Sequence, residues 1–108
     1  MKKGEIWIVE FASTDGHEQE GTRPVIVLAD TESNISIVVP FTSNIQALRF
    51  PHTVEIEPSK HNGLGPKSVA LVFQIRAIDK RRFRNKIGEL EASKMEKINK
   101  ILGTLLRL

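Results

Sequence analysis

The chain has 108 residues, of which 40% are hydrophobic and 27% are charged, values typical of one globular domain spanning residues 1–108. It contains no cysteine, which excludes disulfides and thiolate metal sites. Its apolar runs fall far short of the ~20 residues that span a bilayer, and its N-terminus lacks the apolar core of a signal peptide, so we expect a cytoplasmic protein with no membrane partner.

The net charge of +3 is unevenly distributed along the chain. Residues 67–108 contain eleven Lys and Arg against four Asp and Glu, whereas residues 1–66 contain five against nine. The basic side chains concentrate between Lys80 and Lys86. Such a segment is either a solvated basic turn or a surface that binds a polyanion or an acidic protein, and charge alone does not distinguish these.

Several segments are predicted to be β-strands, because they are apolar and β-branched or alternate with a period of two. In chain order they are Glu5–Phe11, Pro24–Ala29, Ile35–Phe41, His52–Glu57, Ser68–Ile75 and a short continuation at Ala77-Ile78. Pro40, near the end of the third segment, is typical of a strand end or a bulge.

The C-terminal segment changes to the periodicity of a helix. Its apolar stripe consists of Met95, Ile98, Ile101, Leu102, Leu105 and Leu108. Ser93 and Glu96 have the spacing of a capping box, which predicts the start of this helix. Five or six short strands followed by one helix predict a mainly β fold, a small barrel or sandwich, with the helix lying on the sheet.

Two polar clusters stand beside predicted strands. One is the segment 15–24, which leads into a buried strand and contains acidic side chains, an imidazole and a guanidinium. The other is Thr42-Ser43-Asn44, which follows the next strand. If these two strands pair as a hairpin through residues 30–34, Arg23 and Thr42 lie at the same end of the hairpin.

A guanidinium beside a hydroxyl is a good phosphate site, because arginine donates two bonds to phosphate oxygens and stays charged. The alternative for Arg23 is a salt bridge to Glu18 or Glu20. The alternative for Thr42 is a hydroxyl bonded to its own backbone in a turn. His17 is a candidate general acid or base because the imidazole pKa lies near neutrality, and its alternative is an exposed loop histidine.

Other common chemistries are disfavoured by the motifs that the chain lacks. His52 and His61 stand outside any motif, and the three histidines do not have zinc-ligand spacing. We therefore expect no metal and no cofactor. The chain has no GxSxG, GxGxxG or Walker motif, which disfavours serine-hydrolase and nucleotide-hydrolysing activities.

Four segments carry a resemblance to a known family. They are Gly4-Glu5-Ile6-Trp7, then Gly16-His17-Glu18-Gln19 with Gly21-Thr22-Arg23-Pro24-Val25, then Pro40-Phe41-Thr42-Ser43, and finally Ser68-Val69 with Gln74-Ile75-Arg76-Ala77-Ile78-Asp79-Lys80. The ordered set resembles the MazF/PemK/Kid toxins of type II toxin–antitoxin systems. Each piece alone is weakly specific, but the set covers nearly the whole chain in the right order.

The resemblance implies an SH3-like small β-barrel (CcdB/MazF-like) with a C-terminal helix, working as a homodimer. It implies a sequence-specific, ribosome-independent and metal-independent endoribonuclease that cleaves single-stranded mRNA. The reaction it implies is attack of the ribose 2′-OH on the neighbouring phosphate, which produces 2′,3′-cyclic phosphate and 5′-OH ends. It also implies a cognate antitoxin protein that blocks the site, with DNA contacted only through the complex with that antitoxin.

The resemblance also implies roles for individual residues. Arg23 matches the family arginine, which we expect to stabilise the charge of the phosphorane and which is a candidate for protonating the leaving group. Thr42 matches the family threonine and is expected to bond a phosphate oxygen. The general base is either His17 or Glu18, and the sequence leaves this choice open.

Further residues are expected to bind RNA. They are Gln19, Thr22, Ser43, Asn44, Arg81 and Arg82. For Arg81 and Arg82 an acidic segment of the antitoxin is the alternative partner.

The chain departs from some relatives in one respect. Those relatives place an Arg and an Asp two residues apart in the late strand, whereas the corresponding positions here hold Leu71 and Phe73. This removes one acid–base pair and favours His17 or Glu18 as the base.

Two rival functions are compatible with the same barrel: a non-catalytic gyrase poison of the CcdB type, and an RNA-binding module without catalytic activity.

Overall fold

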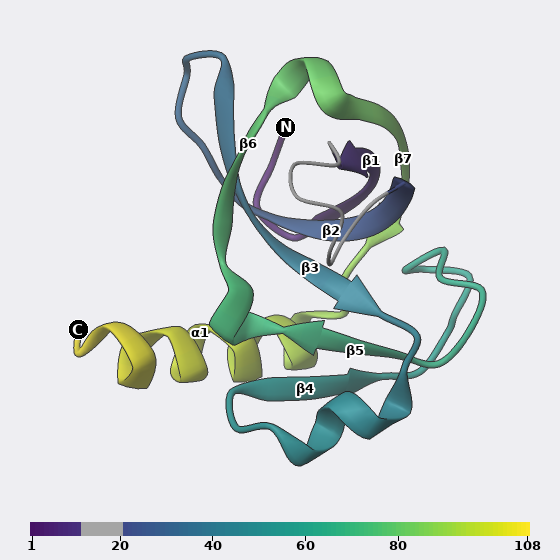
Figure 1. The fold of residues 1–108 in the computed structure, drawn as a ribbon, viewed down its shortest axis with the longest axis vertical. Helices are drawn as coiled ribbons and strands as arrows, with labels where there is room; N and C mark the ends of the chain where they lie inside the picture. The colour runs from purple at the N-terminus through teal and green to yellow at the C-terminus, as the bar shows by residue number, and fades with distance from the viewer. Residues whose placement is uncertain (12–20) are drawn as a thin grey trace.

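The structure is a computed structural model that describes residues 1–11 and 21–108. Its strands are β1 (Glu5–Phe11), β2 (Gly21–Asp30), β3 (Ile35–Thr42), β4 (Thr53–Ile56), β5 (Ser68–Leu71), β6 (Arg76–Asp79) and β7 (Phe83–Glu89). Three short 3₁₀ helices, η1 (Ile45–Arg49), η2 (Val72–Gln74) and η3 (Lys80–Arg82), connect strands, and α1 (Ala92–Leu106) follows β7. Figure 1 shows these elements in sequence colours.

The seven strands form one antiparallel sheet in the order β4-β5-β3-β2-β1-β7, with β6 also paired to β3. The sheet curls on itself (Figure 1), but in the described part of the chain no ladder joins the outer strands β4 and β7. The predicted mainly β, SH3-like fold with a C-terminal helix is therefore confirmed, and its barrel is open rather than closed.

The hairpin predicted between the second and third strands is also confirmed. β2 and β3 are antiparallel neighbours, with Val25 opposite Pro40 and Ile26 opposite Val39. Pro40 lies inside β3 rather than at its end. At Pro40 the partner of β3 on the edge opposite β2 changes: β6 pairs with β3 as far as Val38, and β5 begins pairing at Phe41. A residue without an N–H is accommodated at such a gap in the ladder.

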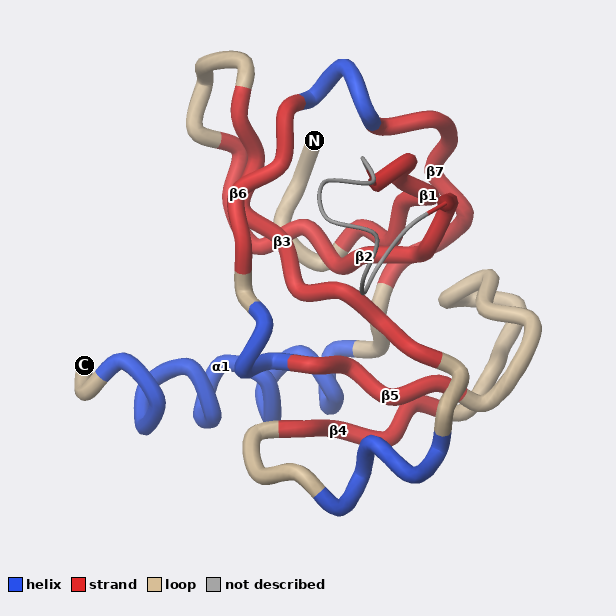
Figure 2. Tube along the Cα trace, viewed as in Figure 1, coloured by secondary structure: helices blue, strands red, loops and turns tan. Residues whose placement is uncertain are grey.

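The core lies on both faces of the sheet. One buried cluster includes Ile26 and Val39 and packs against Ile98 and Leu102 of α1. The other includes Val25 and packs residues of β1, β2, β3, β6 and β7 together. Because neighbouring residues of β2 belong to different clusters, this strand is buried on both sides, as its continuous apolar sequence predicts. α1, the long helix near the bottom of Figure 2, contacts β4 and η2.

The prediction of one strand from Ser68 to Ile75 is wrong. β5 ends at Leu71, and the chain turns through η2 before β6 begins at Arg76. The turn is required because β5 and β6 pair with different parts of β3. The short continuation expected at Ala77-Ile78 is confirmed as part of β6.

The last strand, β7, was not predicted. Its sequence is mostly polar, and Phe83 is its one buried residue. Its position is determined by pairing with β1, where Glu5 lies opposite Glu89 and Trp7 opposite Lys86. Strands that depend on backbone pairing rather than on side-chain burial lack the hydrophobic pattern that sequence analysis detects.

The predicted start of the helix is two residues too late. α1 begins at Ala92 after the N-cap Glu91, so Ser93 lies exposed inside the first turn and caps nothing. Glu91 is held at this position by hydrogen bonds from Ser59 and Asn62. The predicted stripe is confirmed from Met95 to Leu105, but Leu108 lies beyond the helix and is 93% exposed.

No helix in residues 1–11 and 21–108 combines the length and the apolar character needed to cross a membrane.

Gly63 provides a test of how the segment between β4 and β5 crosses β7. Gly63 has a φ of +73°, and a Cβ there would collide with the carbonyl oxygen of Ile87. We expect Gly63→Ala to lower the free energy of unfolding by more than ~1 kcal/mol, since the left-handed conformation alone costs about that much. Gly65→Ala is the matched control, because a Cβ there meets nothing within 4 Å. Urea unfolding of both variants measures the difference, and equal midpoints would contradict this packing.

Asp30 provides a test by pH. Lys80, with the backbone N–H of Glu32, lowers the pKa of Asp30 from 3.8 to about 2. The ionised carboxylate therefore stabilises the fold above about pH 4, and this contribution is lost as the pH falls through about 2. We expect Asp30→Asn to be less stable than the parent at pH 6, with the difference shrinking between pH 4 and pH 2. Thermal unfolding across this range measures it, and a difference that is constant with pH would contradict the assignment.

Candidate functional site

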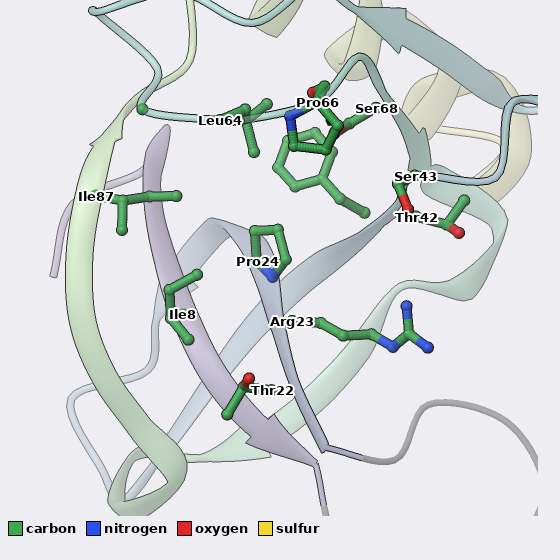
Figure 3. Close-up of a pocket in the computed structure, with 13 residues that line it drawn as sticks. Ile8, Thr22, Arg23, Pro24, Thr42, Ser43, Leu64, Pro66, Ser68 and Ile87 are labelled. Carbon is green, nitrogen blue, oxygen red and sulfur yellow. Dashed lines mark hydrogen bonds between the residues drawn. The ribbon is translucent and has the colours of Figure 1, made fainter.

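The β2–β3 hairpin brings Arg23 and Thr42 to one cavity. Arg23 lies near the start of β2 and Thr42 is the last residue of β3, two positions beyond the Val25–Pro40 pair on each strand. Both side chains are half-buried and both line a cavity of about 380 Å³ (Figure 3). The predicted convergence of a guanidinium and a hydroxyl at one end of the hairpin is therefore present in the structure.

The cavity has a polar side and an apolar side. In Figure 3 the guanidinium of Arg23 and the hydroxyl of Thr42 lie on one side, whereas Ile8, Ile87 and Leu64 lie on the other. The complete lining consists of Ile8, Thr22, Arg23, Pro24, Phe41, Thr42, Ser43, Gly63, Leu64, Gly65, Pro66, Ser68 and Ile87. An apolar wall lowers the local dielectric and strengthens the attraction between a bound anion and the guanidinium.

The Thr42 hydroxyl accepts a hydrogen bond from the backbone N–H of Asn44, at 3.1 Å. The turn-forming bond considered as the alternative reading of Thr42 is therefore present. It does not exclude phosphate binding, because a hydroxyl that accepts one bond still has its own proton to donate. The backbone bond instead fixes the oxygen at the cavity wall.

Arg23 contains a buried polar atom with no partner in the described part of the chain. Its Nε is buried and has no hydrogen-bond partner among the described residues. A buried donor left unsatisfied costs about 1–3 kcal/mol, so an oxygen atom placed beside this nitrogen is favoured. The salt bridge to Glu18 or Glu20, the alternative reading of Arg23, involves residues outside the described part of the chain.

The structure describes only some of the other site residues predicted in the polar segment 15–24. Thr22 lines the cavity from the start of β2. His17, Glu18 and Gln19 lie outside the described residues, so their predicted roles stay predictions.

Ser43 and Asn44 both lie near Thr42. Ser43 lines the main cavity. The Oδ1 atom of Asn44 accepts a hydrogen bond from the Gln46 N–H and so caps η1, and Asn44 lines a second, adjoining cavity. Its amide group has N–H donors that this cap does not use.

Arg81 and Arg82 are not brought to the cavity. They belong to η3, at the top of Figure 1, and neither is among the lining residues. Arg81 is bonded to Asp79 at 3.0 Å, and this bond lowers the pKa of the Asp79 carboxyl. The predicted RNA contact of these two arginines is therefore separate from the Arg23–Thr42 site.

The basic segment as a whole is largely paired with carboxylates. Besides Arg81, Lys80 pairs with Asp30, Arg84 with Glu10, and Lys86 with Glu5 and Glu89. These ion pairs link η3 and β7 to β1 and β2, which is a structural role that charge composition did not predict.

Asn62 supports the cavity wall, a role that the sequence alone did not indicate. It is fully buried, its Oδ1 accepts bonds from the N–H groups of Ser59 and Leu64, and its Nδ2 donates to the Glu57 carbonyl and to Glu91. Burial opposes ionisation of Glu91, but bonds from Ser59 and Asn62 outweigh it and lower its pKa. These bonds position Leu64 and the neighbouring glycines against the cavity.

The positions at which some relatives carry an acid–base pair lie beside the site. Leu71 is buried, Phe73 is 38% exposed, and both line the second cavity together with Arg23 and Thr42.

Residues 1–11 and 21–108 contain no group of three or more His, Asp or Glu side chains arranged to hold a metal ion.

Comparisons with known proteins show similarity over the whole chain. Endoribonuclease MazF of Staphylococcus saprophyticus is 36% identical over 112 aligned positions, covering 100% of this chain and 92% of the relative. The crystal structure of MazF from Deinococcus radiodurans has a TM-score of 0.79 at 27% identity, covering 100% of this chain and 97% of the other. A MazE–MazF crystal structure from the same organism has a TM-score of 0.77 at 26% identity, covering 100% and 96%.

The family profile described as "PemK-like, MazF-like toxin of type II toxin-antitoxin system" matches residues 2–106. The match includes Arg23, Thr42 and every strand of the sheet. The chain therefore belongs to the PemK-like, MazF-like toxin family of type II toxin–antitoxin systems.

Proposed function

We propose that this chain is a metal-independent endoribonuclease toxin that cleaves single-stranded mRNA. The observation that carries the proposal is the convergence of Arg23 and Thr42 on one cavity at the end of the β2–β3 hairpin. Membership of the toxin family and the name of the staphylococcal relative, an endoribonuclease, support it.

The proposed chemistry uses the RNA's own nucleophile. The 2′-OH loses its proton and attacks the adjacent phosphorus, the bond to the 5′-oxygen breaks, and that oxygen takes up a proton. The products are a 2′,3′-cyclic phosphate and a 5′-OH. Because the nucleophile is part of the substrate, this route needs no metal-bound water.

Arg23 and Thr42 are assigned to the phosphate. The guanidinium donates to two phosphate oxygens and stabilises the extra negative charge of the phosphorane, and the Thr42 hydroxyl donates to one of them. The Nε of Arg23 supports this assignment, since it has no acceptor among residues 1–11 and 21–108 and a phosphate oxygen would supply one. Arg23 is also the candidate for protonating the leaving oxygen.

The general base is assigned to the segment 15–24, with His17 and Glu18 as the two candidates. Leu71 and Phe73 have no titratable group, so the late strand cannot supply the acid–base pair that some relatives carry there. The remaining RNA contacts are assigned to Gln19, Thr22, Ser43, Asn44, Arg81 and Arg82.

The proposal includes the setting in which the enzyme works. We assign residues 1–108 to one toxin domain that forms a homodimer in the cytoplasm and is neutralised by a cognate antitoxin protein. Any contact with DNA is assigned to the complex with that antitoxin. The family description and the MazE–MazF structure of the D. radiodurans relative support the antitoxin partner.

Cleavage in the absence of metal tests the central assignment. We expect the purified protein to cut a long unstructured RNA in EDTA, and Arg23→Ala to slow this by about 10³-fold, because the preorganised charge at the phosphate is lost. Arg23→Lys keeps the charge but loses the two-pronged donor, so we expect it to remain strongly impaired. Gel analysis of the RNA over time gives the rates.

Arg107→Asn is the matched control for this experiment. Arg107 lies exposed at the C-cap of α1 with a φ of 57°, a conformation that asparagine tolerates. The substitution removes a guanidinium that is distant in sequence from the residues lining the cavity. Its cleavage rate should equal that of the parent. Full-speed cleavage by Arg23→Ala, or RNA left intact by the parent, would contradict the proposal.

The Thr42 hydroxyl is tested by a pair of substitutions of similar size. Thr42→Val removes the donor and should slow cleavage about 10²-fold, whereas Thr42→Ser retains it and should stay within tenfold of the parent. Single-turnover rates compare the chemical step directly. If the valine and serine variants cleave at the same rate, the Thr42 hydroxyl does not contribute to cleavage, and only its structural bond to Asn44 remains.

A further inference from the structure

A second cavity adjoins the Arg23–Thr42 site, and two exposed phenylalanines are part of its lining. It has a volume of about 260 Å³ and shares Arg23 and Thr42 with the first. Its lining consists of Arg23, Thr42, Asn44, Ala47, Phe50, Leu71, Phe73 and Gln74. No carboxylate is among these residues, so nothing in the described lining repels a polyanion.

Two phenylalanines dominate this second cavity. Phe50 is 45% exposed and Phe73 is 38% exposed, and their ring centroids lie 5.9 Å apart with the planes inclined by 54°. Large aromatic side chains in contact with each other but open to water are characteristic of binding surfaces. The guanidinium of Arg49 lies 5.1 Å from the Phe50 ring centroid and adds a positive charge at this edge.

The backbone holds this aromatic pair in place. Phe50 is the C-cap of η1, and its N–H donates to the Ala47 carbonyl. Phe73 lies in η2, whose first residue, Val72, donates its N–H to the His52 carbonyl at 3.1 Å. The Thr53 hydroxyl of β4 also donates to the Phe50 carbonyl, at 2.9 Å. Both segments are therefore anchored at the β4–β5 ladder, and the rings are presented on short, well-bonded turns rather than on long loops.

We propose that Phe50 and Phe73 form a stacking subsite for a nucleobase of the RNA substrate, next to the phosphate held by Arg23 and Thr42. The inference rests on the proposed function and names a substrate contact that the sequence did not indicate. An aromatic ring binds the face of any base, so the subsite adds affinity and position rather than strict sequence preference. At position 73 the ring takes the place of an acid–base group and contributes binding instead.

A base is the part of the RNA that reaches the second cavity, because the two cavities share Arg23 and Thr42. A nucleotide whose phosphate meets Arg23 and Thr42 has its base within reach of surfaces lined by these same two residues, and the second cavity is such a surface. Its apolar floor of Ala47 and Leu71 and its cationic edge suit a stacked base attached to an anionic backbone.

The test compares two strands of equal length and backbone charge. One is a 12-nucleotide 2′-O-methyl RNA of mixed sequence, which lacks the 2′-OH nucleophile, and the other is a 12-unit abasic strand. We expect the double variant Phe50→Leu/Phe73→Leu to bind the base-containing strand about tenfold more weakly than the parent and the abasic strand equally well. Phe50→Tyr/Phe73→Tyr should bind both strands like the parent, because tyrosine retains the stacking face.

Ile45→Ala is the matched control, since Ile45 is 41% exposed on η1 but does not line the cavity. It should bind both strands like the parent. Sedimentation of each variant monitors folding and oligomeric state. Equal losses on both strands, no loss in the leucine variant, or a changed oligomeric state in that variant would overturn the proposal; the last would show that the rings face a second copy of the chain.

Failure of this subsite and failure of the proposed function are distinguishable. If the leucine variant binds the base-containing strand like the parent while the parent cleaves RNA in EDTA, the subsite is refuted and the function stands. If the parent never cleaves RNA but shows base-dependent binding that needs the two rings, the subsite stands and the nuclease proposal is refuted.

Discussion

The antiparallel pairing of β2 with β3 determines the candidate site. Val25 lies opposite Pro40, so the two residues beyond them, Arg23 and Thr42, end on the same side of the sheet. A shift of one residue in this register would turn each side chain to the other face of its strand. The register is held because successive residues of both strands are buried on opposite faces, in two separate apolar clusters. The site thus depends on core packing several residues away.

The elements that could be predicted are those whose own side chains are buried. The β2–β3 hairpin and the middle of α1 follow from apolar patterns, and the pairing of Arg23 with Thr42 follows from the hairpin. β7 could not be predicted, because its backbone pairs with β1 while most of its side chains stay in solvent. The helix start was misplaced since Glu91 is fixed by Ser59 and Asn62, which are distant in sequence.

The same limit applies to the candidate site. Arg23 and Thr42, which belong to one hairpin, were identified from sequence. Phe50 and Phe73 were not, because β4 and β5 lie between them in the chain and only the sheet brings their ring centroids to 5.9 Å. The role of Asn62 was not identified either, because its bond to Glu91 forms only when the segment between β4 and β5 is placed beside the start of α1. Charge composition also did not indicate that carboxylates pair with most of the basic side chains near η3, because those carboxylates lie on other strands or turns.

The central claim is that Arg23 and Thr42 hold a phosphate while the neighbouring ribose attacks it. The chemistry of the product ends tests this most directly: RNA cut in EDTA is sequenced after ligation reactions that distinguish 5′-OH from 5′-phosphate and cyclic from open 3′ ends. The account predicts 5′-OH and 2′,3′-cyclic phosphate ends at every cut, and no cut where the attacking ribose is replaced by 2′-deoxyribose. Products with 5′-phosphate ends, or cleavage at a 2′-deoxy position, would contradict it.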